Sequence, residues 1–261
     1  MNILDRIIAD KKNEVALRKS LFPISYWEAS PLFDRPLNRL SSRLRSSHSG
    51  IIAEHKRRSP SKQTINTKLS VSEVVQGYDK AGACGLSILT DHKYFGGSLE
   101  DLNLARATTT LPLLRKEFIV DEYQLIEAKA QGADLVLLIA AVLSREEIQT
   151  LSTVAQKLDL EVLLEIHNQE ELEKSIMPSL DLLGVNNRNL KTFEVSLETS
   201  RALAPLIPDE FVKVSESGLS DIQSIKILQS IGYQGFLVGE NFMKTTQPGS
   251  AAQEFISQLE K

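Results

Sequence analysis

The chain has 261 residues, of which 42% are apolar and 25% are charged, an ordinary composition for a globular protein. Its 30 basic and 34 acidic residues leave a net charge of −4, which argues against broad binding of nucleic acid or of an anionic membrane and leaves room for a local basic pocket for one small anion. The single cysteine, Cys84, excludes an intrachain disulfide and fits a reducing compartment.

Three further features of the sequence narrow the class of protein. The charges in MNILDRIIADKK come too early for the apolar region of a signal peptide. The longest apolar run, 135–143, is too short to cross a bilayer. The four histidines have no paired metal-ligand spacing. We therefore expect a cytoplasmic protein that binds no metal, no nucleic acid and no membrane.

Residues 1–49 do not share the pattern of the rest of the chain. Apolar residues recur on one stripe of NILDRIIADKKNEVALRKS, which predicts a helix over about 3–19. The segment 21–50 contains three prolines and is predicted to be irregular. We expect 1–49 to be an N-terminal helical extension, helix plus loop, that packs over one end of the main domain.

From about residue 50 onward, short apolar runs alternate with segments of helical period. The segments 70–83, 121–133 and 144–158 place apolar residues at i, i+3, i+4 and i+7, as an amphipathic helix does. Ser70 with Glu73, and Ser144 with Glu147, have the spacing of capping boxes. The eight runs predicted as strands are IIAEHK (51–56), LSILT (86–90), PLLRKEF (112–118), DLVLLIA (134–140), EVLLEI (161–166), LLGVNNR (182–188), FVKVSES (211–217) and GFLVGE (235–240).

Strands that alternate with helices imply a parallel sheet. Eight such units favour closure into a single (β/α)8 TIM barrel of the α/β class over 50–261. An open doubly wound sheet is less well supported, because no GxGxxG follows the first strand.

Polar side chains gather where these strands end. Strand residues in a barrel alternate between the interior and the helix layer, and the chemistry lies at the C-terminal strand ends. On the inward parity, five of the runs begin apolar and become polar near their exits: IIAEHK, PLLRKEF, EVLLEI, LLGVNNR and FVKVSES. Any one of these charges alone would more often be solvated or part of a structural ion pair, but charges on five strand ends, with none deeper, favour a functional cluster. Its members are Glu54, Lys56, Lys116, Glu165, Arg188 and Glu216.

Two glycines point to a phosphate site. Gly218 and Gly239 follow the seventh and eighth strands, just before predicted helix starts. Small residues there let backbone N–H groups approach an anion at a helix N-terminus. The loops after these two strands are a frequent phosphate site in barrels of this type.

Seven motifs occur in order along the predicted strands: EHKRRSPS, KYFGGS, LLRKEF, LLEIHN, GVNNRNL, VSESG and FLVGENFM. As a set they resemble the indole-3-glycerol phosphate synthase family, over nearly the whole chain. The resemblance implies a barrel with its N-terminal extension over the active-site end. It implies a carboxy-lyase of tryptophan biosynthesis that converts 1-(2-carboxyphenylamino)-1-deoxyribulose 5-phosphate into indole-3-glycerol phosphate, releasing carbon dioxide and water. It implies no cofactor and is compatible with association with another pathway enzyme. The sequence itself does not give the oligomeric state, and we expect a monomer.

The resemblance also implies roles for individual residues. Lys116 matches the general acid that protonates the ribulose carbonyl oxygen, and Glu165, Glu54 and Lys56 match acid/base and electrostatic groups for the later steps. Which of these three acts at dehydration stays open. Substrate binding is implied for Phe95, Phe118, Asn186, Arg188, Glu216 and Ser59, and phosphate binding for Ser217, Gly218, Gly239 and Glu240.

One implied phosphate ligand is awkward on physical grounds. The Glu240 carboxylate would repel a phosphate, so we expect its backbone N–H to bind and its side chain to turn away. The aromatic pair Phe95 and Phe118 raises no such conflict, because a wall of rings can hold the anthranilate ring near the carbonyl.

Three other functions remain compatible with parts of the pattern. A Schiff-base aldolase would use Lys116 as its nucleophile, and a stable imine trapped by borohydride would identify it. A phosphate-binding isomerase would show activity without release of carbon dioxide. A binding or assembly protein would keep the phosphate loops without the chemistry of Lys116 and Glu165.

Overall fold

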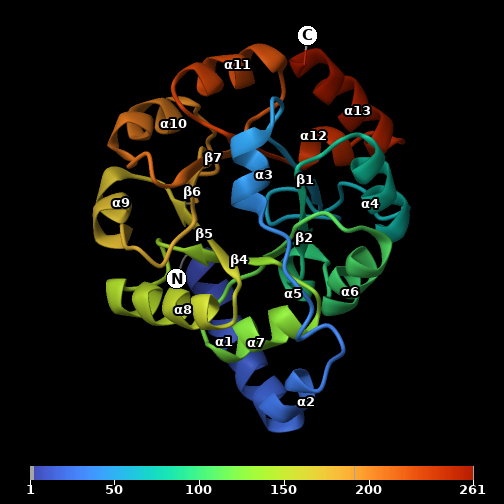
Figure 1. The fold of residues 1–261 in the computed structure, drawn as a ribbon, viewed down its shortest axis with the longest axis vertical. Coiled ribbons are helices and arrows are strands. Elements are labelled where there is room, and N and C mark those ends of the chain that lie inside the picture. Colours follow the sequence, from blue (N-terminus) through green and yellow to red (C-terminus); the bar gives the residue numbers. More distant parts are fainter. Residues whose placement is uncertain (1–2, 191, 261) are drawn as a thin grey trace.

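The computed structural model describes residues 3–190 and 192–260, and its eight strands form one closed, parallel barrel in sequence order (Figure 1). The barrel closes because β1 pairs with both β2 and β8. Each predicted run overlaps one strand, so the (β/α)8 prediction is confirmed. The strands are β1 (Ile51–His55), β2 (Gly85–Leu89), β3 (Leu113–Lys116), β4 (Leu135–Ile139), β5 (Glu161–Ile166), β6 (Leu182–Asn186), β7 (Val212–Glu216) and β8 (Gly235–Val238).

Helices surround the barrel on its outside (Figure 1). Both predicted capping boxes are present, at the starts of α4 and α8. Within the described residues, no helix combines the length and apolar character needed to cross a membrane. The helices that follow the strands are α4 (Val71–Lys80), α5 (His92–Phe95), α6 (Leu99–Thr108), α7 (Tyr123–Ala130), α8 (Arg145–Lys157), α9 (Gln169–Ser175), α10 (Glu198–Leu203) with the 3-10 turn η1 (Ala204–Leu206), α11 (Ile222–Ser230), α12 (Glu240–Met243) and α13 (Pro248–Leu259).

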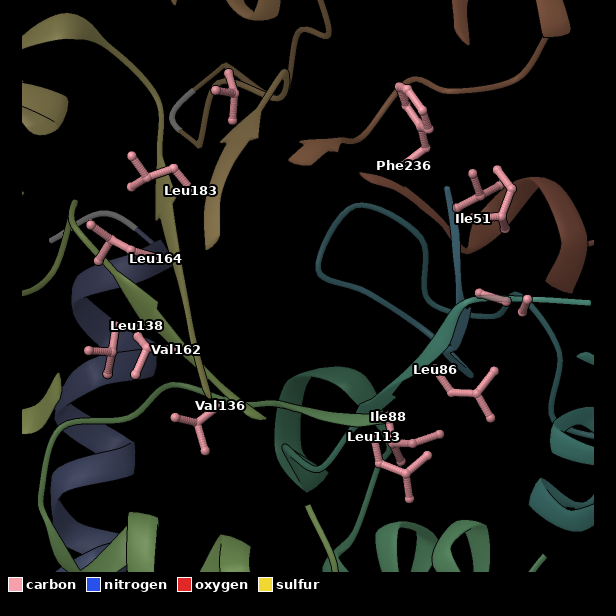
Figure 2. Packing of buried hydrophobic residues seen from close by; sticks show 14 of the residues in the cluster. Ile51, Leu86, Ile88, Leu113, Val136, Leu138, Val162, Leu164, Leu183 and Phe236 are labelled. Carbon is pink, nitrogen blue, oxygen red and sulfur yellow. The ribbon is translucent and has the colours of Figure 1, made fainter. Parts of the chain in front are cut away.

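Alternation along the strands divides the core into two layers. Side chains of one parity point outward from the ring of strands toward the helices (Figure 2). Those of the other parity fill the barrel, with Ile52, Leu114, Leu163, Val214 and Leu237 among them. The inward parity is the one predicted from the sequence, so every strand that carries a predicted charge presents it to the barrel mouth.

The N-terminal segment is more ordered than predicted and covers both ends of the barrel. Helix α1 (Ile3–Leu21) confirms the predicted first helix, and α2 (Ile24–Glu28) packs on α7, where Trp27 Nε1 donates to Tyr123 Oη at 2.7 Å. The prediction of an irregular 21–50 segment is wrong, because α3 (Leu40–Ser46) lies in front of the ring of strands (Figure 1). The division into 1–49 and 50–261 as domains stays a prediction.

Helix α3 closes the barrel at the end opposite the predicted site. Leu40 and Leu44 join the inner apolar cluster. The backbone N–H of Leu40 donates to Glu161, the first residue of β5, at 2.6 Å. Glu161 is buried and shares the inward parity of its strand, so the prediction that no charge lies deeper than the exits is wrong. The sequence did not reveal this residue's role because its partners lie far away in the chain, at the start of α3.

Candidate active site

A cavity of about 380 Å³ opens at the C-terminal ends of the strands. It is lined by every site residue predicted from the sequence, including residues of five strands and of the loops that follow them. These residues are Glu54, Lys56, Ser59, Phe95, Lys116, Phe118, Glu165, Asn186, Arg188, Glu216, Ser217, Gly218, Gly239 and Glu240. The structure therefore brings together residues that are spread over more than half of the chain.

Lys116 occupies the centre of the charged cluster. It ends β3, and its Nζ lies 3.3 Å from Glu165 Oε2 and in direct hydrogen-bond contact with Glu216 Oε2. Parallel pairing sets these positions, because Leu89 is opposite Lys116, Ile139 is opposite Glu165, and the exits of all three strands lie at the same end. One ammonium group thus meets two carboxylates from other strands.

Glu54 and Lys56 form a second acid–base pair on β1 and the loop after it. Lys56 Nζ donates to Glu54 Oε1 at 2.7 Å, and Ser87 Oγ donates to Glu54 Oε2 at 3.1 Å. Glu54 is buried, whereas Lys56 is partly exposed toward the cavity. The pair therefore offers a proton acceptor and a proton donor side by side at the barrel mouth.

The environment drives the pKa values of the three carboxyls apart. Burial raises the pKa of Glu216 to about 7, since Glu165 and Glu54 add to the cost of its charge and Lys116 offsets only part of it. Burial also opposes the charges on Glu165 and Glu54, but the neighbouring ammonium groups outweigh it and the pKa of each carboxyl is lowered. For Lys116, burial opposes the charge while the three carboxylates favour it, and its pKa is raised. Near neutral pH the site therefore holds a charged lysine, two ionised carboxylates and one carboxyl that can carry a proton.

Two glycines leave room for these carboxyls. A Cβ atom at Gly184 would lie 2.5 Å from Glu216 Oε1, and one at Gly239 would lie 2.7 Å from Glu54 Oε1. Contacts this short do not occur, so any larger residue would displace the carboxyl. The sequence indicated Gly239 as part of a phosphate loop, but it gave no sign of Gly184, which matters through its neighbour on the adjacent strand.

An aromatic pair forms another part of the cavity. The ring centroids of Phe95 and Phe118 are 6.0 Å apart and their planes are inclined at 42°. Phe118 packs against the inner apolar cluster, which includes Leu137 and Ile139, and both of these also line the cavity. This part of the site can hold a flat apolar ring close to the charged cluster.

Asn186 links β6 to the charged cluster and to the loop beyond. Its side-chain oxygen accepts from the backbone N–H of Arg188 at 3.0 Å, and its side chain also hydrogen-bonds to Glu165. Arg188 is partly buried and adds a guanidinium to the cavity wall. These two residues can orient an anionic or hydroxylated substrate.

The exits of β7 and β8 form the part of the cavity predicted to hold phosphate. Ser217 and Gly218 both have positive φ, 68° and 76°, so the chain turns sharply as β7 ends. Buried Asn187, which the sequence analysis did not select, donates to the carbonyl oxygens of Glu216 and Ser217 at 3.0 Å each and braces this turn. Only its place inside the GVNNRNL motif could have drawn attention to it.

Glu240 and Ser59 lie at the same edge of the cavity. The Glu240 carboxylate pairs with Lys62 Nζ at 2.9 Å, and the expectation that this side chain turns away from a bound phosphate stays a prediction. Ser59 and Lys62 exchange backbone hydrogen bonds of 2.8 and 3.0 Å, and this tight loop places Ser59 on the cavity wall.

Helix α1 supplies lining residues that the sequence analysis did not assign to the site. Ile3, Leu4 and Ile7 reach the cavity from its first two turns. Their apolar stripe predicted the helix, but a stripe does not say which surface it covers. His167 was also missed, although its Nε2 lies 3.4 Å from Glu165 Oε1.

Fold and site together define a (β/α)8-barrel enzyme with acid–base chemistry at the C-terminal strand ends. Within the described residues, no three His, Cys, Asp or Glu side chains are grouped to hold a metal ion. A family model described as indole-3-glycerol phosphate synthase matches residues 4–255. The chain belongs to this family of carboxy-lyases in tryptophan biosynthesis.

Individual relatives agree with the family match. An indole-3-glycerol phosphate synthase of Bacteroides thetaiotaomicron is 50% identical over 260 residues, which are 99% of both chains, and that of Chromobacterium violaceum is 42% identical over 96% of both. Among solved structures, a thiamine phosphate pyrophosphorylase from Pyrococcus furiosus matches with a TM-score of 0.60 and 16% identity, covering 85% of this chain and 98% of its own. At that identity the likeness concerns the fold alone.

Proposed function

We propose that this cavity closes, decarboxylates and dehydrates 1-(2-carboxyphenylamino)-1-deoxyribulose 5-phosphate to indole-3-glycerol phosphate. One observation supports this assignment above the others. A buried, charged lysine stands among carboxyls of different pKa, with an aromatic pair and a glycine-rich loop pair in the same cavity. The reaction needs all of these features: a proton donor, acid–base groups, a ring wall and a phosphate cradle.

The first step forms a bond between the ring carbon that carries the carboxylate and the ribulose carbonyl carbon. As the carbonyl π electrons move to oxygen, Lys116 donates the proton that the oxygen needs. Glu165 and Glu216 hold the ammonium group in place and keep it charged. Phe95 and Phe118 hold the ring against the carbonyl, where orientation contributes a large part of the rate.

The later steps release carbon dioxide and then water. The carboxylate leaves as carbon dioxide, and its bonding electrons return to the ring system. The hydroxyl group then takes up a proton and leaves as water. A base removes a proton from the newly closed ring as the indole forms. Glu54 and Lys56 supply an acceptor and a donor side by side for this dehydration, and ionised Glu165 is available as a further base.

Binding of the phosphate is assigned to the exits of β7 and β8. Backbone N–H groups of Ser217, Gly218, Gly239 and Glu240 form the cradle, with Ser59 shaping the loop beside it. Asn186 and Arg188 orient the rest of the substrate. We further propose that the protein acts on this phosphorylated small molecule as a cytoplasmic monomer. Association with another pathway enzyme remains a separate proposal, and sedimentation equilibrium at cellular protein concentrations tests both.

The proposal is tested by incubating the protein with the substrate and measuring indole fluorescence and carbon dioxide together. We expect one carbon dioxide for each indole product. An isomerase would release no carbon dioxide, and a binding protein would produce neither signal. A Schiff-base aldolase would leave a lysine adduct after borohydride treatment, which the raised pKa of Lys116 disfavours because a protonated amine is not a nucleophile.

A further inference from the structure

Lys11 is a buried lysine on a helix outside the barrel. It lies on α1, it is 2% exposed, and its Nζ contacts Glu14 at 2.8 Å and both Asp91 Oδ2 and Glu117 Oε1 at 3.1 Å. Burying an ammonium group is costly unless it is paired. Burial opposes the charge on Lys11, but Glu117 and Asp91 outweigh it and the pKa of Lys11 is raised. A paired charge therefore lies where α1 meets the barrel.

The first of its barrel partners holds the backbone of Phe95. Asp91 is the N-cap of the short helix α5, and its Oδ1 accepts from the N–H groups of Tyr94 at 2.7 Å and Phe95 at 3.2 Å. Its other oxygen faces Lys11. A change in the position of the Asp91 carboxylate would therefore shift the helix that ends in Phe95.

The second partner holds the backbone of Phe118. Glu117 Oε1 accepts from the N–H of Phe118 at 2.8 Å and also faces Lys11, while its Oε2 accepts from Thr90 Oγ1 at 2.8 Å. Glu117 lies between Lys116 and Phe118 in the chain. Lys11 thus connects, through one carboxylate each, to both members of the aromatic pair.

We infer that Lys11 is a positioning residue, which holds Asp91 and Glu117, and through them Phe95 and Phe118, in the arrangement that receives the aromatic ring of the substrate. This inference rests on the proposed function, because it assumes that the ring binds at this pair. It gives α1 a task in the chemistry besides covering the cavity with Ile3, Leu4 and Ile7.

Other contacts anchor α1 independently of Lys11. Asp10 pairs with Lys93 at 2.7 Å, Arg18 with Glu127 at 2.7 Å, and Lys19 with Asp121 at 2.9 Å. Helix α1 should therefore stay docked when Lys11 is replaced. The effect of replacement then concerns Asp91 and Glu117, which lose their lysine partner, and the rings that they hold; Glu117 keeps a longer contact of 4.0 Å with Arg115.

The test compares Lys11→Met with Lys12→Met, since Lys12 is the next residue and is exposed. Inhibition constants are measured for indole-3-glycerol phosphate, which occupies the ring wall and the cradle, and for inorganic phosphate, which occupies the cradle alone. We expect Lys11→Met to weaken inhibition by the product at least about tenfold, as a small misplacement of binding groups does. Inhibition by phosphate stays as in the wild type, and Lys12→Met changes neither constant.

A second variant covers the case in which Lys11→Met folds poorly. Adding Glu117→Gln removes one of the two buried charges that faced Lys11, while the amide oxygen can still accept from the Phe118 N–H, so the double variant should bind the product nearly as the wild type does. Equal weakening of both inhibitors, or unchanged product affinity, would overturn the positioning role. Failure of the wild type to form indole would overturn the proposed function instead, and the two failures are therefore distinct.

Discussion

Lys116 and Glu216 come from strands β3 and β7, on opposite sides of the barrel, and form an ion pair across its mouth. Glu165 joins the pair from β5 at 3.3 Å. In the proposed mechanism the substrate carbonyl takes its proton from Lys116, and the neighbouring carboxylates keep this lysine protonated.

Replacing Lys116 should remove turnover and leave binding in place. Lys116→Ala takes away the proton donor, and we expect the rate to fall by at least about 10²–10⁴-fold. The phosphate cradle lies on β7 and β8, so the inhibition constant for inorganic phosphate should not change. Single-turnover indole formation and phosphate inhibition are the measurements. Unchanged turnover would remove the proposed mechanism.

Replacing Glu165 by glutamine should slow the reaction because the carboxylate charge is lost, although the shape of the side chain is kept. Glu165→Gln keeps the size of the side chain and removes the base, with an expected loss of roughly 10²–10⁴-fold in kcat. The matched control is Glu161→Gln, which changes a buried glutamate at the other end of the same strand. The control should alter stability and spare the rate. A near-native rate for Glu165→Gln would mean that this residue is structural.

Loss of Lys56 should separate decarboxylation from dehydration. If the Glu54–Lys56 pair acts at dehydration, Lys56→Met releases carbon dioxide in a single turnover and forms indole much more slowly. Lys116→Ala, in contrast, should lose both signals, because it blocks the first bond-forming step. Rapid-quench measurement of both products checks this. Parallel loss of both products in Lys56→Met would place Lys56 in binding or in ring closure.

The pKa of Glu216 gives a pH signature of stability. Its pKa is raised from 4.5 to about 7 in the folded protein, so the folded state holds this proton more tightly than the unfolded state. The stability that the group contributes is complete below pH 4.5 and is lost as pH rises through about 7, by about 3 kcal/mol in all. Glu216→Gln does not titrate. We would measure the free energy of unfolding in urea for the wild type and for Glu216→Gln. Between about pH 5 and about pH 8 the wild type should lose stability relative to the variant. A difference in unfolding free energy that does not change with pH would contradict this.

Gly218 should be needed for phosphate binding because it has no side chain, and not only because it can adopt a positive φ. It has φ of +76°, and an added Cβ would lie 2.5 Å from Val195 Cγ1; Gly82 has φ of +85° with nothing within 4 Å. Both Gly218→Ala and Gly82→Ala should cost about 1–2 kcal/mol of folding free energy from the left-handed conformation. Gly218→Ala alone should raise KM roughly tenfold, which corresponds to about 1.4 kcal/mol of binding. An effect confined to kcat would contradict the cradle.

Local patterns were enough to predict the barrel and the charged side chains at its mouth. The change from apolar to polar along IIAEHK and EVLLEI placed Glu54 and Glu165 at the mouth, because alternation and strand direction are fixed by short-range geometry. The family motifs added residues such as Phe95, which ends the short helix α5, a helix of too few residues to show a periodicity of its own.

The remaining features depend on contacts between distant parts of the chain. Lys11 looks like one more surface lysine, since its partners Asp91 and Glu117 are far away in sequence. Gly184 is important because Glu216 needs the space beside it. Helix α3 looked like a loop because its stability comes from packing Leu40 and Leu44 under the barrel and not from local propensity.

A crystal structure of the protein with bound indole-3-glycerol phosphate would test the proposed site as a whole. We expect the indole ring against Phe95 and Phe118, the phosphate on the backbone N–H groups of Ser217, Gly218, Gly239 and Glu240, and the rest of the product within reach of Lys116. A ring held elsewhere, or a phosphate away from the exits of β7 and β8, would contradict it.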